Sequence, residues 1–144
     1  MNEFTIETTI ARPIAGVFAY AANAENIPLY SPMVTEAHMD SDTQTIGVHT
    51  TMKGRFLKIP YETVWETTDY KEDEVLAAKT VSGPFDMEVN HRFESVEGGT
   101  RMTSHWRGDS KGFFKLAEPV MVRLTKRQLE TAAETMKELL EADA

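Results

Sequence analysis

The chain has 144 residues and no cysteine, and its 15 Lys and Arg stand against 23 Asp and Glu, for a formal net charge of −8. This length fits one domain, so we expect residues 1–144 to form a single domain. The absence of cysteine excludes disulfides, thiolate nucleophiles and cysteine-ligated metal centres. The acidic balance disfavours nucleic acid as a partner, because phosphate backbones attract clustered Lys and Arg.

Hydropathy gives no sign of a membrane span or of a targeting segment. The longest nearly continuous apolar run, Ala15 to Ala22, is far shorter than the roughly 20 residues that a spanning helix requires. The first residues, up to Glu7, lack a basic region followed by an apolar stretch, so they do not form a signal peptide. We therefore expect a cytoplasmic protein without membrane insertion, whose acidic surface serves solubility.

The first elements are a strand and two short helices. Phe4, Ile6 and Ile10 alternate with polar residues over positions 2–10, which predicts a half-buried strand. Pro13 suits the first turn of a helix that ends near Asn23. Residues 24–32 predict a second short helix or turn, which two prolines close.

The middle of the chain is predicted to be antiparallel sheet. Turn residues separate short stretches in which apolar and polar residues alternate, which is typical of strands with one buried face. The predicted strands run from Met33 to Met39, from Gly47 to Phe56, from Pro60 to Tyr70, from Val75 to Ser82, from Phe85 to Glu94 and from Thr100 to Arg107.

From about Phe113 to Ala142 the apolar spacing changes to three and four residues, which predicts one long amphipathic helix. Pro119 disfavours an interior helical position, so the turns before it are expected to be kinked or part of a loop. The predicted apolar stripe consists of Ala117, Met121, Leu124, Ala132, Met136 and Leu139.

Strands segregated from helices in this order define an α+β fold. Local sequence adds a family resemblance, in the stretches from Ile10 to Tyr20, from Asn23 to Pro32 and from Ser82 to Met87, and in Gly98-Gly-Thr-Arg101. The resemblance continues into the final helix, and the ordered set resembles the START-like superfamily, also called SRPBCC or the helix-grip fold. The chain is most similar to the polyketide cyclase/dehydrase-like branch.

This resemblance implies a curved antiparallel sheet of six to seven strands that wraps around the long C-terminal helix, with two short helices after the first strand. It also implies a cavity between the sheet and that helix, with Tyr30 at its entrance. Aromatic and Met side chains with a few polar groups suit a small hydrophobic ligand. The candidate ligand-binding residues are Tyr30, Tyr61, Trp65, Met87, Val89, His91, Phe93, Met102, Ser104, Trp106, Met121 and Leu124.

Three functions stay open at this point. The first is binding of a polyketide-like, aromatic or lipid molecule, and the second is an aromatase/cyclase or dehydratase in which His91 carries the proton. The third is a chaperone for a quinone or another lipid. Ser104 has no acid to complete a triad, and His38, His49 and His105 are scattered without metal-ligand spacing. We therefore predict no metal and no cofactor, and either a monomer or a homodimer.

Overall fold

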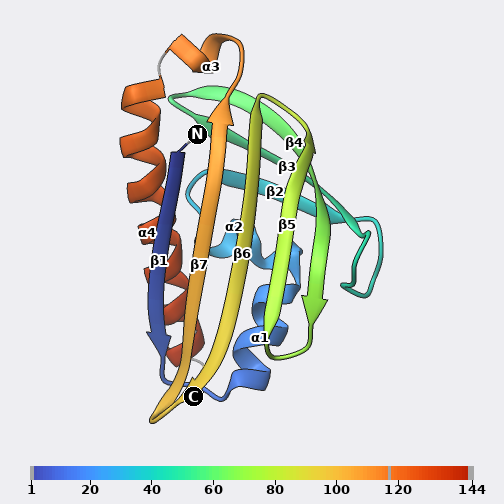
Figure 1. The fold of residues 1–144 in the computed structure, drawn as a ribbon, viewed down its shortest axis with the longest axis vertical. Helices are drawn as coiled ribbons and strands as arrows, with labels where there is room; N and C mark the ends of the chain where they lie inside the picture. Colours follow the sequence, from blue (N-terminus) through green and yellow to red (C-terminus); the bar gives the residue numbers. More distant parts are fainter. Residues whose placement is uncertain (1, 117, 143–144) are drawn as a thin grey trace.

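The computed structural model describes residues 2–116 and 118–142 of the chain. One seven-stranded antiparallel sheet has the strand order β1-β7-β6-β5-β4-β3-β2. Each strand from β2 to β6 pairs with the next one along the chain, and β7 pairs with β1. This arrangement confirms the helix-grip α+β fold. Figure 1 shows that the sheet is curved and that α4 lies beside β1. The strands are β1 (Asn2–Ile10), β2 (Val34–Met39), β3 (His49–Phe56), β4 (Ile59–Lys71), β5 (Val75–Ser82), β6 (Phe85–Val96) and β7 (Gly99–Ser110).

The helices lie before and after the run of sheet strands. They are α1 (Ile14–Ala22), the 3-10 turn η1 (Ala24–Asn26), α2 (Ile27–Tyr30), α3 (Phe113–Leu116) and α4 (Glu118–Ala142). The single long helix expected from Phe113 onward is thus two helices, and Pro119 occupies the first turn of α4, where proline is tolerated. The predicted helix residue Ala117 lies outside the described residues.

The pairing of β4 with β5 has two irregularities. Between Val64 and Trp65 the extra residue is Val81 of β5, so the alternation of β4 continues and Thr67 faces the inside of the sheet together with Trp65. Between Thr67 and Asp69 the extra residue lies in β4 itself, and such a β-bulge changes which face the following side chains occupy. Beyond this second shift, Tyr70 therefore packs against the core.

Buried side chains form two separate clusters. The larger one joins α1, the strands β5–β7 and the end of α4, with Ile10 and Val17 fully buried and Phe18 next to them. The ring of Phe18 meets Tyr70 and Phe93 edge to face, at centroid distances of 5.5 and 5.1 Å. The smaller cluster is defined by Phe56 and Met121, and it lies toward the other end of α4. Members of both clusters line a cavity, which is described below.

Helix α4 presents its apolar stripe to the sheet with one correction to the predicted register. Met121, Leu129, Ala132 and Met136 are buried, whereas Leu139 is 41% exposed. Leu140 packs against the larger cluster instead. An α-helix turns about 100° per residue, so Leu140 lies about 40° away from Met136 around the helix axis and Leu139 lies about 60° away. Position 140 is therefore closer to the apolar stripe than position 139.

Candidate functional site

An internal cavity of about 230 Å³ lies between the concave face of the sheet and helix α4. Strand alternation positions its walls, because every second residue of β4, β6 and β7 points to the same face. Ten of the twelve residues proposed from the sequence line the cavity. They are Tyr30, Tyr61, Trp65, Met87, Val89, His91, Met102, Ser104, Trp106 and Met121.

The two other predicted residues, Phe93 and Leu124, do not line the cavity. Phe93 is on the inner face of β6, but α1 covers that part of the sheet and Phe18 packs against the ring. Leu124 packs beside Met121 in the smaller core cluster. The helix residues that do face the cavity beside Met121 are Val122, Thr125, Leu129, Ala132, Ala133 and Met136.

Tyr30 lies in the cavity wall, and its place at an entrance stays a prediction. Its ring is tilted against that of Tyr20 at a centroid distance of 6.0 Å, and it packs on the larger core cluster. Burial, together with the neighbouring Tyr20, raises the pKa of Tyr30 above its ordinary value. The Tyr30 hydroxyl is therefore a neutral donor in the physiological range of pH.

His91 and Ser104 provide a polar point in this apolar wall. They are directly paired across β6 and β7, and His91 Nδ1 shares a hydrogen bond with Ser104 Oγ at 2.6 Å. Burial lowers the pKa of His91 to about 4, so the imidazole is neutral at pH 7. Because the serine hydroxyl both donates and accepts, the other ring nitrogen of His91 can be an acceptor or a donor.

Two polar atoms of this site have no protein partner. Within the described residues, no hydrogen bond involves His91 Nε2 or the Tyr30 hydroxyl. In the same part of the chain, no side-chain nitrogen or oxygen is both fully buried and unpaired. Both atoms are therefore accessible to solvent, and both residues line the cavity.

Aromatic rings surround the polar point. The indoles of Trp65 and Trp106 meet edge to face at a centroid distance of 6.5 Å, and His91 meets Trp106 in the same way at 5.8 Å. Such perpendicular contacts fix the orientation of each ring. Trp65 Nε1 donates to Thr63 Oγ1 at 3.1 Å, so this indole N–H is already satisfied within the protein.

At the end of the cavity near the start of α4, the lining becomes polar. Glu118 accepts hydrogen bonds from Asn2 Nδ2 at 3.2 Å and from the Ser110 backbone N–H at 3.4 Å, and its other oxygen is 3.0 Å from Lys115 Nζ. A polar hollow adjoins the cavity here and shares part of its lining with it. We call this hollow the vestibule; its residues are Asn2, Asp109, Lys115, Glu118, Pro119 and Val122.

Close backbone packing shapes the neighbouring wall. Tyr61 donates its hydroxyl to the Met33 carbonyl at 2.9 Å, and burial raises the pKa of Tyr61 to about 12. Gly54 makes this contact possible, because a Cβ atom at that position would lie 1.8 Å from the same carbonyl oxygen. Tyr61 therefore braces the β2–β3 edge and has no free hydroxyl to offer a ligand.

Some of the lining was not found in the sequence. Phe4 and Ile6 carry a signal, since β1 alternates clearly, but their side chains were assigned only to a buried face. Gln44 carries none, because it belongs to a loop. It accepts from Thr67 Oγ1 at 2.7 Å and donates to the Ala22 carbonyl at 3.0 Å, which ties that loop to the cavity wall.

The polar lining does not form a metal site. No group of three or more His, Asp or Glu side chains in residues 2–116 and 118–142 is arranged to hold a metal ion. His38, His49 and His105 lie on the outside of the sheet. Within the same residues, no helix combines the length and the apolar character needed to cross a membrane.

Comparison with known proteins agrees with this architecture. The chain belongs to the family described as polyketide cyclase / dehydrase and lipid transport, whose model matches residues 1–141. No sequence match is found among curated proteins.

Solved structures share the fold at low sequence identity. The Thermus thermophilus protein TTHA0849 superposes with a TM-score of 0.85 at 16% identity, over 99% of both chains. A START superfamily protein from Mycobacterium smegmatis gives 0.81 at 12% identity, again over 99% of both chains. The di-domain ARO/CYC StfQ of the steffimycin biosynthetic pathway gives 0.75 at 12% identity, over 94% of this chain and 49% of its own. Identities this low establish a common fold.

Proposed function

We propose that this chain, as one START-like domain, binds a small hydrophobic molecule in the cavity between the sheet and α4. The observation that carries the proposal is the cavity of about 230 Å³, whose walls are mainly aromatic, Met and aliphatic side chains. Its volume is many times the roughly 30 Å³ that one water molecule occupies in the liquid, and apolar walls favour an apolar guest over water. The family description, which includes lipid transport, supports the same conclusion.

The polar atoms inside the cavity narrow the chemistry of the ligand. His91 is neutral at pH 7 and the Tyr30 hydroxyl is protonated, so neither offers a charge. A charged group placed beside them would lose its hydration without gaining a counter-ion, which is costly. The ligand is thus an uncharged aromatic, polyketide-like or lipid molecule, with a carbonyl or hydroxyl oxygen that bonds to His91 Nε2 or to Tyr30.

The two tryptophans of the chain, Trp65 and Trp106, both line the cavity, so intrinsic fluorescence reports on its contents. Titration with the neutral probe N-phenyl-1-naphthylamine is expected to quench tryptophan emission by energy transfer, with saturation at one probe per chain. Uncharged polyketide-like, quinone or fatty alcohol competitors should displace the probe, and the matching carboxylates should displace it less well.

A cavity-filling variant tests the location of the probe. Ala133→Leu places extra methyl groups into the cavity and should weaken probe binding by about tenfold, since a filled space excludes the guest. Ala142→Leu makes the same change at an exposed position of α4 and should leave binding unchanged. Equal binding by the two variants would show that the probe is held elsewhere and would contradict the proposal.

A second candidate function is cyclisation or dehydration of a poly-ketone chain, and the pairing of His91 with Ser104 favours it. A neutral imidazole open to the cavity can accept a proton from a carbon next to a carbonyl, or pass one to a leaving hydroxyl. His91→Ala should then abolish turnover of a poly-β-keto thioester while circular dichroism shows an unchanged fold. His105→Ala, on the outer face of the sheet, is the matched control; retained turnover in His91→Ala would end this role.

A further inference from the structure

Three exposed aliphatic side chains gather at the vestibule end of the molecule. Leu116 is 86% exposed, Val120 54% and Leu57 43%. They belong to α3, to the first turn of α4 and to the β3–β4 turn, which lie at the same end in Figure 1. The packing of Phe56 with Met121 holds that turn next to α4. We call these three side chains the apolar tip.

The two chain segments that hold the apolar tip carry an excess of basic residues. Residues 53–58 and 111–127 together contain eight basic residues and one acidic residue, a net charge of +7 in a chain of −8, so the remainder carries −15. Lys111 pairs with Asp86 and Lys115 pairs with Glu118. In the described part of the chain, the other basic residues of the two segments have no ion pair; they are Lys53, Arg55, Lys58, Arg123, Lys126 and Arg127.

The β3–β4 turn presents its two residues in an unfavourable backbone conformation. Leu57 and Lys58 have φ angles of 54° and 66°, in the left-handed region that Asn and Gly prefer in two-residue hairpins. Residues with longer side chains are strained there. Strain of this kind is characteristic of functional positions, and here it places one aliphatic and one cationic side chain at the end of the molecule.

We propose that the apolar tip and its surrounding cations dock on an anionic lipid surface. Aliphatic side chains enter the boundary between headgroups and acyl chains, while Lys and Arg remain among the anionic headgroups. An anionic surface repels a chain of −8 unless the charge is segregated, and here the acidic remainder lies outside the two basic segments. Docking of this end would turn the vestibule toward the bilayer. The inference goes beyond ligand binding in the cavity and does not depend on it.

Vesicle flotation with the full chain tests the docking. We expect binding to phosphatidylcholine vesicles that contain about 30 mol% phosphatidylserine, no binding to phosphatidylcholine alone, and release in about 0.5 M salt. The double variant Leu116→Glu/Val120→Glu should reduce binding by more than about tenfold, because it places anions against the headgroups. Val81→Glu, at a 48% exposed position of β5, is the matched control and should bind like the native chain.

The charged residues are tested separately. Lys58→Glu/Arg123→Glu should also reduce binding more than about tenfold, whereas the same reversal at Lys71 and Lys79, outside the two segments, should reduce it much less. No vesicle binding, or equal binding to neutral and anionic vesicles, overturns the proposal. None of the altered side chains lines the cavity, so probe quenching in the same variants shows whether cavity binding persists independently.

Discussion

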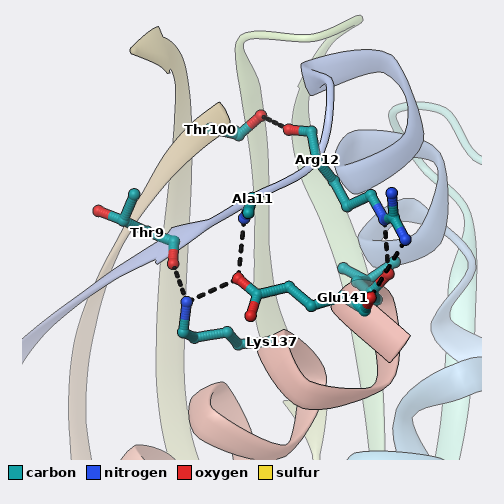
Figure 2. A network of polar contacts seen from close by, with 7 residues as sticks. Thr9, Ala11, Arg12, Thr100, Lys137 and Glu141 are labelled. Carbon is teal, nitrogen blue, oxygen red and sulfur yellow. Dashed lines mark hydrogen bonds and ion pairs between the residues drawn. The ribbon is translucent and has the colours of Figure 1, made fainter. Parts of the chain in front are cut away.

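The two ends of α4 are attached to the sheet in different ways. At its C-terminal end, Arg12 Nε donates to the Leu140 carbonyl at 2.7 Å and an Arg12 Nη donates to that of Glu141 at 3.2 Å. The Glu141 carboxylate accepts from the Ala11 backbone N–H at 2.8 Å, and Lys137 Nζ donates to the Thr9 carbonyl at 2.7 Å (Figure 2). A cation at a helix C-terminus satisfies carbonyls that lack partners and complements the helix dipole.

The N-terminal end has fewer and longer contacts. Glu118 connects α4 to the start of β1 and to the end of β7, at 3.2 and 3.4 Å, and Ser110 Oγ donates to Met121 Sδ at 3.9 Å. The core beneath it has two buried members, Phe56 and Met121, whereas eight form the cluster beneath the other end. The cavity reaches its polar vestibule at this less firmly attached end. The comparison indicates that the C-terminal end of α4 contributes more to the stability of the fold than the N-terminal end.

The largest expected difference concerns the two core clusters. Phe18→Ala should lower the free energy of unfolding by about 3–5 kcal/mol, because a fully packed aromatic ring is lost and a void remains. Phe56→Ala, the matched truncation at the vestibule end, should cost less, since its cluster is smaller and adjoins the cavity. Urea denaturation measures both, and equal losses would mean that the two ends contribute alike to stability.

His91 lies between the two ends and makes stability depend on pH. Its pKa is lowered from 6.5 to about 4 in the folded chain, so the unfolded chain takes up the proton first as the pH falls. Stability from this group is fully present above pH 6.5 and is lost between that pH and about 4, by about 3 kcal/mol in total. Unfolding experiments across this range should show a flatter profile for His91→Gln. Identical profiles would contradict a buried neutral imidazole.

Loss of a polar contact should destabilise the fold more at the C-terminal end of α4 than at its N-terminal end. Arg12→Ala removes two hydrogen bonds from a charged donor and should cost about 1.5–3 kcal/mol. Asn2→Ala removes one neutral donor from Glu118 and should cost about 0.5–1.5 kcal/mol. Hydrogen exchange should show faster opening of the last turns of α4 in the first variant only. Faster exchange at the first turns of α4 instead would reverse the assignment.

The smallest expected effect is a gain in stability at the β3–β4 turn. Replacing Leu57-Lys58 with Asn-Gly should raise the free energy of unfolding by about 1 kcal/mol, because both residues then prefer the left-handed conformation. Asp73→Gly, in the turn after β4, is the control with a φ of 62°, and it should change stability less because Asp tolerates this region. Thermal unfolding measures both variants. A loss of stability with Asn-Gly would show that the native turn is not strained.

Much of the fold was predictable because it depends on local signals. Alternation over Asn2–Ile10, and turn residues on either side of Val75–Ser82, predicted strand bounds that the structure reproduces, and Pro119 indicated where the final helix divides. Strand faces follow from the same periodicity: Glu94 and Arg101 are paired across β6 and β7, and their charged groups lie 2.6 Å apart. That ten of the predicted residues line the cavity follows from the same periodicity; whether they contact a ligand stays a prediction.

The sequence by itself determined the order of the elements and the inner faces of β1, β6 and β7, because these depend on periodicity and turn residues along the chain; the family followed from the resemblance of local sequence. Only the tertiary structure decided which inner residues line empty space. Phe93 is covered by α1, while Gln44 reaches the cavity from a distant loop. A cavity is the volume that remains after the sheet has curved and the helices have packed. Alternation along a strand predicts the face of the sheet to which a side chain points, but it does not predict whether a helix or empty space lies opposite that side chain.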